Sequence, residues 1–297
     1  MDTPNFIPTF QQISDPILDE KGIKLYVLRT DLNHPEISGN KLYKLKYNLE
    51  EAKKQGKNTL LTFGGAFSNH IAATAAAGKL AGLSTIGIIR GDELSDLNPT
   101  LKLANENGMH LHYVSRELYR DKEALMNYVH SEFGENIYAI PEGGSNALGV
   151  KGCREITQSI DIRFDFICAP CGTGATFSGI LLSLKDKQQA IGFQVLKAEN
   201  YIKKEVEHWL AEFKQNDKGS WSINEDYHFG GYAKVNESLK NFIQNFNSKH
   251  HIPLDFVYTG KMLFGIIDLI HNNYFTAGST IIAVHTGGLQ GNKGFTN

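Results

Sequence analysis

Short apolar runs alternate with helical patterns along the 297-residue chain, and this alternation constrains the fold more than any other feature. Runs that are apolar on successive residues, such as residues 164–169, are typical of strands buried on both faces of a sheet. Parallel strands need long crossover connections, which are usually helices. The sequence therefore predicts an α/β fold with mostly parallel sheets flanked by helices on both faces.

Loops rich in glycine and polar residues follow several predicted strands. The predicted strands are residues 60–63, 85–89, 110–114, 138–140, 164–169, 192–196, 256–258 and 280–284. The predicted helices are residues 42–54, 71–81, 100–107, 122–130, 176–184, 204–213, 236–246 and 261–271. The polar loops after strands are residues 64–70, 141–146, 172–176, 258–261 and 285–288. Ligands of open α/β sheets bind beyond the carboxyl ends of the strands, so these loops are candidates for a binding site.

Composition and charge exclude several classes of function. The formal net charge is −2 and the chain has no basic block, which argues against nucleic acid as a partner. No basic segment followed by an apolar run opens the sequence, and no apolar stretch is long enough to cross a bilayer. We therefore expect a soluble, cytoplasmic protein that does not associate with a membrane.

The chain has three cysteines, and an odd and small number argues against a disulfide scaffold. Cys168 and Cys171 have the spacing of a redox motif, but Cys168 falls within a buried apolar strand. No second cysteine pair completes a zinc site, and we expect no metal. A structural role for both cysteines is the preferred interpretation, with a redox or metal role as the alternative.

Lys41 follows the tight turn Ser38-Gly39-Asn40, at the point where a polar loop enters the predicted helix 42–54. A single lysine is most often a surface residue. The turn instead places this lysine beside a polar pocket, where its amine could form a Schiff base with an aldehyde.

The segment Gly172-Thr173-Gly174-Ala175-Thr176 follows a predicted strand and opens a predicted helix. Its backbone N–H groups can converge on an anion such as phosphate. It is neither a Walker loop nor a full dinucleotide fingerprint, since Phe177 stands where the third glycine would be. Taken alone, the loop is equally well explained as a structural turn. Taken with Lys41, it suggests a ligand that is both aldehyde and phosphate, namely pyridoxal 5′-phosphate.

The loop at residues 64–70 ends in Ser68, Asn69 and His70, directly before a predicted helix. These side chains could bind a carboxylate or a cofactor. The alternative is a simple helix cap with a surface histidine.

Read together, these motifs resemble the pyridoxal-phosphate dependent enzymes of fold type II, and more narrowly the 1-aminocyclopropane-1-carboxylate deaminase / D-cysteine desulfhydrase family. The matching segments occur in order over nearly the whole chain, at residues 39–45, 68–70, 141–149, 172–176, 258–261 and 285–288. The resemblance implies two open, twisted sheets of the tryptophan synthase β type. It also implies a larger cofactor domain (residues 1–47 and 139–297), a smaller domain (48–138) and a homodimer.

The resemblance also implies a role for each matching cofactor residue. Lys41 would form the Schiff base with the cofactor, and Asn69 would bind its ring oxygen. Lys44 would hold the phosphate together with Gly172, Thr173, Gly174, Ala175 and Thr176.

The implied substrate site uses the remaining matches. Ser68 would hold the substrate carboxylate, with Asn69 and His70 also facing the substrate. Tyr258 would lie beside the ring, and Tyr232 would be the second active-site tyrosine. Phe67 stands where both branches of the family usually carry Gln.

Two threonines discriminate between the branches. The deaminase branch has Glu at the position of Thr259 and Leu at that of Thr286, whereas the desulfhydrase branch has Thr at both. A carboxylate facing the pyridine nitrogen would keep it protonated and strengthen the electron sink. A hydroxyl gives a weaker sink, which suffices for elimination of a good leaving group. The resemblance therefore favours a lyase that converts a small amino acid, foremost D-cysteine, to a 2-oxo acid, ammonia and sulfide, with Thr259 at the cofactor and Thr286 at the substrate.

Three alternatives stay open at this stage. The first is 1-aminocyclopropane-1-carboxylate deaminase, and the second is a pyridoxal-phosphate binding protein without turnover. The third is a nucleotide-binding α/β protein, although no acidic residue follows a glycine fingerprint at the required distance.

Overall fold

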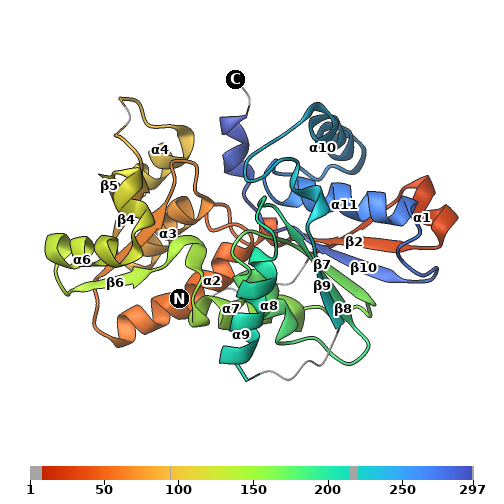
Figure 1. Ribbon diagram of the computed structural model, residues 1–297, viewed down its shortest axis with the longest axis horizontal. Helices are drawn as coiled ribbons and strands as arrows, with labels where there is room; N and C mark the ends of the chain where they lie inside the picture. Colours follow the sequence, from red (N-terminus) through yellow and green to blue (C-terminus); the bar gives the residue numbers. More distant parts are fainter. Residues whose placement is uncertain (1–8, 94, 215–219, 296–297) are drawn as a thin grey trace.

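The computed structural model describes residues 9–93, 95–214 and 220–295, and within them two open sheets lie side by side (Figure 1). The larger sheet has six strands in the order β1-β2-β10-β7-β8-β9, and the smaller has four in the order β5-β4-β3-β6. Neighbouring strands are parallel, except for the antiparallel pair β1 and β2. The prediction of two mostly parallel sheets is confirmed.

Helices separate most of these strands. The strands are β1 (Phe10–Ile13), β2 (Lys24–Leu28), β3 (Thr59–Gly64), β4 (Ser84–Arg90), β5 (Met109–Val114), β6 (Ile137–Ile140), β7 (Phe166–Cys171), β8 (Gln189–Gln194), β9 (Ser220–Asn224) and β10 (Thr280–Val284). The α-helices are α1 (Pro16–Lys21), α2 (Asn40–Lys54), α3 (Asn69–Ala81), α4 (Pro99–Glu106), α5 (Arg116–Arg120), α6 (Lys122–Phe133), α7 (Ala147–Gln158), α8 (Ala175–Leu181), α9 (Tyr201–Glu212), α10 (Glu237–His250) and α11 (Thr259–His271). Four short 3₁₀ turns complete the described chain, η1 (Thr30–Leu32), η2 (Glu142–Gly144), η3 (Asp226–His228) and η4 (Leu289–Gly294).

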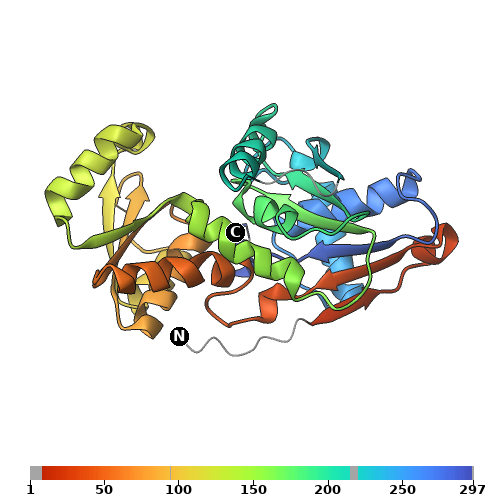
Figure 2. The same ribbon diagram turned by 90° about the horizontal axis from the view of Figure 1, so that it is seen from below.

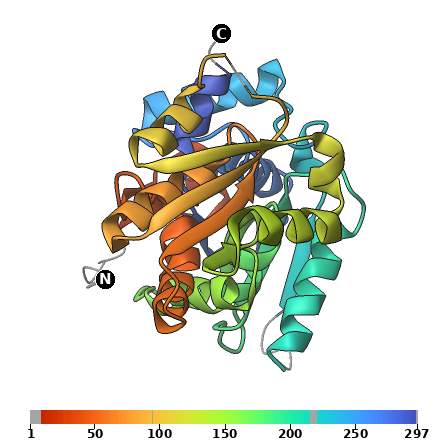
Figure 3. The same cartoon turned by 90° about the vertical axis from the view of Figure 1, so that its left-hand side faces the viewer.

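Both faces of the smaller sheet are covered by helices, as its continuous apolar strands require. Leu60 packs in a cluster with residues of α2 and α3, whereas its neighbour Leu61 packs with residues of α5 and α6 on the opposite face. Figure 3 looks at this half of the molecule, with α3 and α6 on either side of the sheet. The same arrangement holds for the larger sheet, where α7, α8 and α9 pack on one face and α1, α10 and α11 on the other.

The carboxyl ends of the central strands of the larger sheet meet between the two halves of the molecule. Strand β10 pairs in parallel with both β2 and β7, although these strands lie far apart in the sequence. Helix α7 crosses between the two halves, and α2 packs against it while extending along the smaller sheet (Figure 2). Loops from both halves therefore face a common space, which is where the sequence places the candidate site.

One predicted strand is wrong. Residues 256–258 form a turn that leads into α11. The carboxylate of Asp255 accepts hydrogen bonds from the backbone N–H groups of Val257, Tyr258 and Thr259, at 3.0, 2.6 and 2.8 Å. Those donors are therefore unavailable to a strand ladder. Four of the five polar loops follow strands as predicted, and the fifth, residues 258–261, belongs to the start of a helix.

Other differences concern boundaries and short elements. The predicted strand 192–196 is shifted to β8, and α2 begins at Asn40 rather than Leu42, so Lys41 lies inside the helix. Strands β1, β2 and β9 were not predicted, and neither were α1, α5 and α7. Of these strands, β1 and β9 lie at the edges of the larger sheet, whereas β2 lies between β1 and β10. Edge strands carry mixed polar and apolar residues, which weakens their pattern in the sequence.

The division into a larger domain (residues 1–47 and 139–297) and a smaller one (48–138) stays a prediction. Residues 1–8 and 296–297 of the predicted larger domain lie outside the described residues. Among the described residues, no helix has the length and apolar character needed to cross a membrane.

Candidate active site

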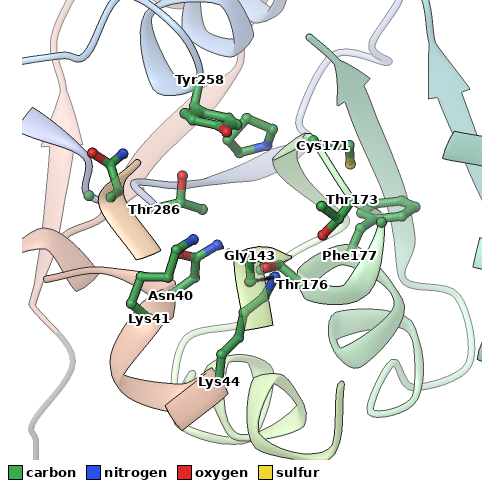
Figure 4. A pocket seen from close by; sticks show the side chains of 15 residues that line it. Asn40, Lys41, Lys44, Gly143, Cys171, Thr173, Thr176, Phe177, Tyr258 and Thr286 are labelled. Carbon is green, nitrogen blue, oxygen red and sulfur yellow. Dashed lines mark hydrogen bonds between the residues drawn. The ribbon is translucent and has the colours of Figure 1, made fainter. Parts of the chain in front are cut away.

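Lys41 lies in the first turn of α2 and lines a pocket beyond the carboxyl ends of β7 and β10 (Figure 4). Its Nζ donates a hydrogen bond to Oδ1 of Asn40 at 3.0 Å. Burial, together with the charge of nearby Lys44, lowers the pKa of Lys41 to about 7. Near neutral pH, a large fraction of the protein molecules therefore carry Lys41 as a neutral, nucleophilic amine.

Lys44 lies one helical turn further along α2, on the floor of the same pocket, and is 2% exposed. Its ammonium group donates to the carbonyl oxygen of Gly143 at 2.9 Å, and burial lowers its pKa. Among residues 9–93, 95–214 and 220–295, no carboxylate forms an ion pair with it. A buried ammonium group without a counter-ion is costly, so the site favours a bound anion.

The glycine loop connects β7 to α8 and lines the pocket beside the amine of Lys44. Gly172, Thr173, Gly174 and Thr176 line the pocket, whereas Ala175 is buried in the first turn of α8 and does not. No side chain caps that turn, which leaves its backbone N–H groups available to an anion. Nδ2 of Asn40 donates to the hydroxyl of Thr176 at 2.8 Å and ties the loop to α2. Figure 4 shows the Lys44 amine beside Thr176 and Gly143.

The three cysteines are all buried. Cys168 and Cys171 lie within β7, and all three cysteines are buried and unpaired. Burial raises the pKa of the Cys168 and Cys171 thiols. A thiol with a raised pKa is a poor nucleophile and metal ligand, which supports the structural interpretation.

The loop at residues 64–70 leads into α3, and its candidate residues Ser68, Asn69 and His70 lie in different places relative to the pocket. Oγ of Ser68 caps α3 by accepting from the N–H of Ile71 at 3.4 Å. Asn69 lines the pocket, and its buried Oδ1 has no hydrogen-bond partner among the described residues. His70 is 1% exposed behind the pocket wall, and neither of its ring nitrogens has a partner within the described chain.

Burial, with the charges of Lys41 and Lys44, lowers the pKa of His70 well below its usual value. This histidine is therefore a neutral imidazole at physiological pH. Phe67, in the same loop, is 49% exposed and lies against the C-terminal turn, where a Cβ on Gly294 would come within 3.0 Å of its ring.

Two tyrosines from separate loops meet at one edge of the pocket. Tyr258 lines the pocket, and its hydroxyl donates to that of Tyr232 at 3.3 Å. The two rings pack edge to face with centroids 6.0 Å apart. Burial raises the pKa of Tyr258, so its phenol stays protonated. Tyr232 does not itself line the pocket and is 48% exposed, but the structure brings it against the residue that does.

The two discriminating threonines are not equivalent. Thr286, just after β10, lines the pocket between Tyr258 and Lys41 (Figure 4). Thr259 is fully buried behind the wall, and its hydroxyl has no hydrogen-bond partner among the described residues. Thr286 is therefore the threonine in direct contact with the pocket, and a role for Thr259 at the cofactor stays a prediction.

Sequence reasoning missed Asp255, which is 1% exposed and holds the start of α11. Its carboxylate binds three consecutive backbone N–H groups, ending with those of Tyr258 and Thr259. An aspartate whose carboxylate accepts from the backbone N–H groups two and three residues further on is a known turn pattern, which could have revealed it.

The model for the family described as "Pyridoxal-phosphate dependent enzyme" matches residues 9–287. The chain belongs to this family. The resemblance that the motifs indicated is therefore confirmed, and with it the dependence on pyridoxal phosphate.

Similar proteins extend the comparison within the pyridoxal-phosphate dependent enzymes. The chain is 34% identical over 296 residues to "Bifunctional D-cysteine desulfhydrase/1-aminocyclopropane-1-carboxylate deaminase, mitochondrial" of Arabidopsis thaliana, covering 91% of this chain and 73% of that protein. It is 31% identical over 288 residues to "Putative 1-aminocyclopropane-1-carboxylate deaminase" of Pyrococcus abyssi, covering 92% and 86%. A solved structure described as "Crystal Structure Analysis of the ACC deaminase homologue" superposes with a TM-score of 0.83 at 27% identity, covering 98% of this chain and 92% of that one.

The pocket fits the cofactor that defines the family. Lys41 offers a neutral amine for the aldehyde, and Lys44 offers a buried ammonium group without a counter-ion for the phosphate. The uncapped first turn of α8 supplies backbone donors beside it. The unpartnered Oδ1 of Asn69 faces the same space. Among the described residues, Lys44 has no counter-ion, Oδ1 of Asn69 has no hydrogen-bond partner and no side chain caps α8. A phosphorylated aromatic aldehyde would supply a partner to each of these groups and an electrophile to Lys41.

Proposed function

We propose that this pyridoxal-phosphate dependent enzyme eliminates the β-substituent of a small D-amino acid, foremost D-cysteine, to give a 2-oxo acid, ammonia and sulfide. The observation that carries the proposal is the absence of any Asp or Glu among the described residues that line the pocket. Without a carboxylate to protonate the ring nitrogen, the electron sink is weak and suits a substrate with a good leaving group. The Arabidopsis relative has D-cysteine desulfhydrase in its name, which supports this substrate.

The proposed roles at the cofactor follow from the contacts of each group. When bound, the cofactor bonds to the substrate amino group and withdraws electrons from its α carbon. Lys44 and the segment from Gly172 to Thr176 would hold the phosphate, and Asn69 and Thr259 would bind the ring. Lys41 would bind the aldehyde carbon when no substrate is present.

Lys41 is also the proposed base. Its Nζ is held at 3.0 Å by Asn40, and its pKa of about 7 leaves it able to accept the proton from the substrate α carbon. The C–S bond then breaks, and the sulfur leaves as sulfide. Water completes the reaction by releasing the 2-oxo acid and ammonia.

The remaining residues would orient the substrate. Ser68, at the positive end of α3, would bind its carboxylate with the help of Asn69 and His70. Neutral His70 can donate one hydrogen bond and accept another. Thr286 would bind the substrate from the opposite wall. With substrate bound, the protonated phenol of Tyr258 would turn its single O–H from Tyr232 to the leaving sulfur, and the hydroxyl of Tyr232 would then donate to the oxygen of Tyr258.

A second candidate is 1-aminocyclopropane-1-carboxylate deaminase, since the Pyrococcus relative bears that name. Opening an unactivated ring needs a stronger electron sink than a pocket lined only by neutral and basic side chains offers. We therefore place this activity second.

The proposal is tested by recording the visible spectrum of purified holoenzyme before and after D-cysteine is added, with pyruvate and sulfide assayed together. We expect a yellow protein whose absorption band shifts as sulfide appears. A yellow protein that releases no sulfide, but forms ammonia from the cyclopropane substrate, would favour the second candidate. A yellow protein that turns over neither substrate would be a binding protein without this activity.

A substitution tests the lysine directly. K41A is expected to lose the visible band of the lysine-bound cofactor and to lower turnover by about 1,000-fold or more, as removal of a catalytic nucleophile does. K53A, an exposed lysine on the same helix, is the matched control and is expected to retain both. Turnover in K41A at the wild-type rate would refute the assignment.

We also propose that the enzyme is a cytoplasmic homodimer. The dimer rests on the resemblance to fold type II enzymes, and light scattering during gel filtration tests it. Three buried, unpaired cysteines are consistent with a reducing compartment, which supports the cytoplasm.

A further inference from the structure

Lys261 is a buried lysine outside the pocket. It lies in the first turn of α11 and is 0% exposed. Its Nζ donates to two backbone carbonyl oxygens, those of His228 at 2.9 Å and Gly231 at 2.8 Å. An apolar side chain would be cheaper to bury at this position, so the ammonium group has a specific use in holding those carbonyls.

The segment that Lys261 holds has little regular structure of its own. Between η3 and α10, Phe229, Gly230, Gly231 and Ala233 all have positive φ angles, of 54°, 93°, 125° and 54°. A chain in this conformation cannot join a helix or a strand ladder. Its described backbone hydrogen bonds are local, from Gly231 to His228 and from Lys234 to Gly231. The contacts from the start of α11 therefore connect it to the residues of the pocket, while η3 also packs against β8.

Tyr232 follows directly after the held carbonyl of Gly231, and it accepts the hydrogen bond from Tyr258 at 3.3 Å. Tyr258 and Lys261 lie three residues apart at the start of α11. Tyr258 contacts the side chain of Tyr232, and Lys261 contacts the carbonyl oxygen of the preceding residue, Gly231. Phe229 adds a second attachment to the same helix, with its ring 5.0 Å from that of Phe264. The start of α11 thus presents Tyr258 to the pocket and at the same time fixes the loop that carries its partner.

We propose that Lys261 is a positioning residue for the elimination reaction, because its two hydrogen bonds hold residues 228–232 so that Tyr232 orients the hydroxyl of Tyr258 at the pocket. The inference rests on the proposed function only for its effect on turnover. The attachment of the loop is a property of the protein alone and can be measured separately.

The first test is amide hydrogen exchange on the holoenzyme. K261M is expected to speed exchange at residues 229–235 by about tenfold or more, the effect of losing one net hydrogen bond. K240M, which replaces a partly exposed lysine on α10, is the control and is expected to leave that segment unchanged. Wild-type protection of the segment in K261M would overturn the proposal even if the enzyme had no known substrate.

The second test is a double-mutant cycle on kcat for D-cysteine. K261M and Y232F are each expected to lower kcat by about tenfold, and the double variant is expected to fall no further than the lower single variant. If the fold-loss of kcat in the double variant equals the product of the two single fold-losses, Lys261 acts independently of Tyr232, and the proposal is overturned.

Two further variants separate positioning from folding. K261R keeps the charge and the donors, and we expect it to restore both loop protection and kcat to within about threefold of wild type. If K261M does not fold, K261Q replaces it, because its shorter side chain cannot reach both carbonyls. Slow exchange with full kcat in K261Q would contradict the inference.

Discussion

Burial and the ammonium group of Lys44, one helical turn along α2, together lower the pKa of Lys41 to about 7. The lysine that attacks an aldehyde must be neutral, and the lysine that holds a phosphate must be charged. Two lysines on one helix face can serve these two purposes because the first loses its proton while the second finds an anionic partner.

The first prediction concerns the pH dependence of cofactor uptake. Only neutral Lys41 reacts with the aldehyde, so the uptake rate of apo-protein is expected to rise about tenfold per pH unit below its pKa of about 7 and to level off above it. Stopped-flow absorbance after mixing with pyridoxal phosphate measures this rate. Nα-acetyl-lysine, measured over the same range, corrects for ionisation of the cofactor. A rate that still rises steeply above pH 9 would show an unperturbed lysine.

The second prediction concerns Gly39, which precedes α2 with φ of +69°. A Cβ at this position would lie 2.0 Å from the carbonyl oxygen of Thr286. Its ψ of −142° places Gly39 outside the left-handed α region, so G39A is expected to cost about 1–3 kcal/mol for its backbone conformation. The overlap is expected to cost about 1–3 kcal/mol more. Urea unfolding measures the free energy of unfolding. G56A is the control for a positive φ without crowding, because Gly56 has φ of +67° and no atom within 4 Å of its Cβ position, so it is expected to be less destabilised than G39A.

The third prediction concerns Asp255, whose carboxylate holds the backbone of Tyr258 and Thr259. D255A is expected to destabilise the protein by about 2–3 kcal/mol, because three N–H groups lose a charged acceptor. It is also expected to lower kcat, since Tyr258 is no longer fixed at the pocket. D121A removes the exposed cap of α6 and is the control. It is expected to lose about 1 kcal/mol of stability and no activity. If D255A and D121A have equal kcat, Asp255 does not position Tyr258 for the reaction.

The fourth prediction concerns the hydroxyl of Thr286, which lines the pocket. T286V preserves the shape of the side chain and is expected to lower kcat/KM for D-cysteine by about tenfold, the value of one hydrogen bond. Its melting temperature is expected to stay close to that of wild type. T276V, at an exposed threonine, provides the comparison. An unchanged kcat/KM in T286V would remove this hydroxyl from the substrate site.

Much of the fold could be predicted because its central strands are apolar on successive residues and end in glycine-rich loops. The positions of Lys41 and of the Gly172–Thr176 loop followed from local rules for turns and helix starts. The strand predicted at residues 256–258 failed because the carboxylate of Asp255 occupies its donors, and this competition depends on tertiary burial.

Other parts of the site could not be derived from the local pattern. The hydrogen bond from Tyr258 to Tyr232 joins two segments 26 residues apart, and Lys261 reads in sequence as one more polar residue of a helix start. Thr259 and Thr286 both distinguish the family branches in sequence. Only Thr286 lines the pocket, whereas the side chain of Thr259 lies buried behind the pocket wall. Which side of an element faces a ligand is decided by packing partners that the local sequence does not contain.

The position of β10 between β2 and β7 has a consequence for how the protein is made. A ribosome releases the residues of α2 and the phosphate loop long before those of β10. Until Thr280–Val284 are inserted, β2 and β7 have no common neighbour, and Lys41 has no opposite wall. A nascent chain therefore cannot bind the coenzyme during most of its synthesis. The yellow colour is therefore expected to appear only after β10 has been translated and has paired with β2 and β7.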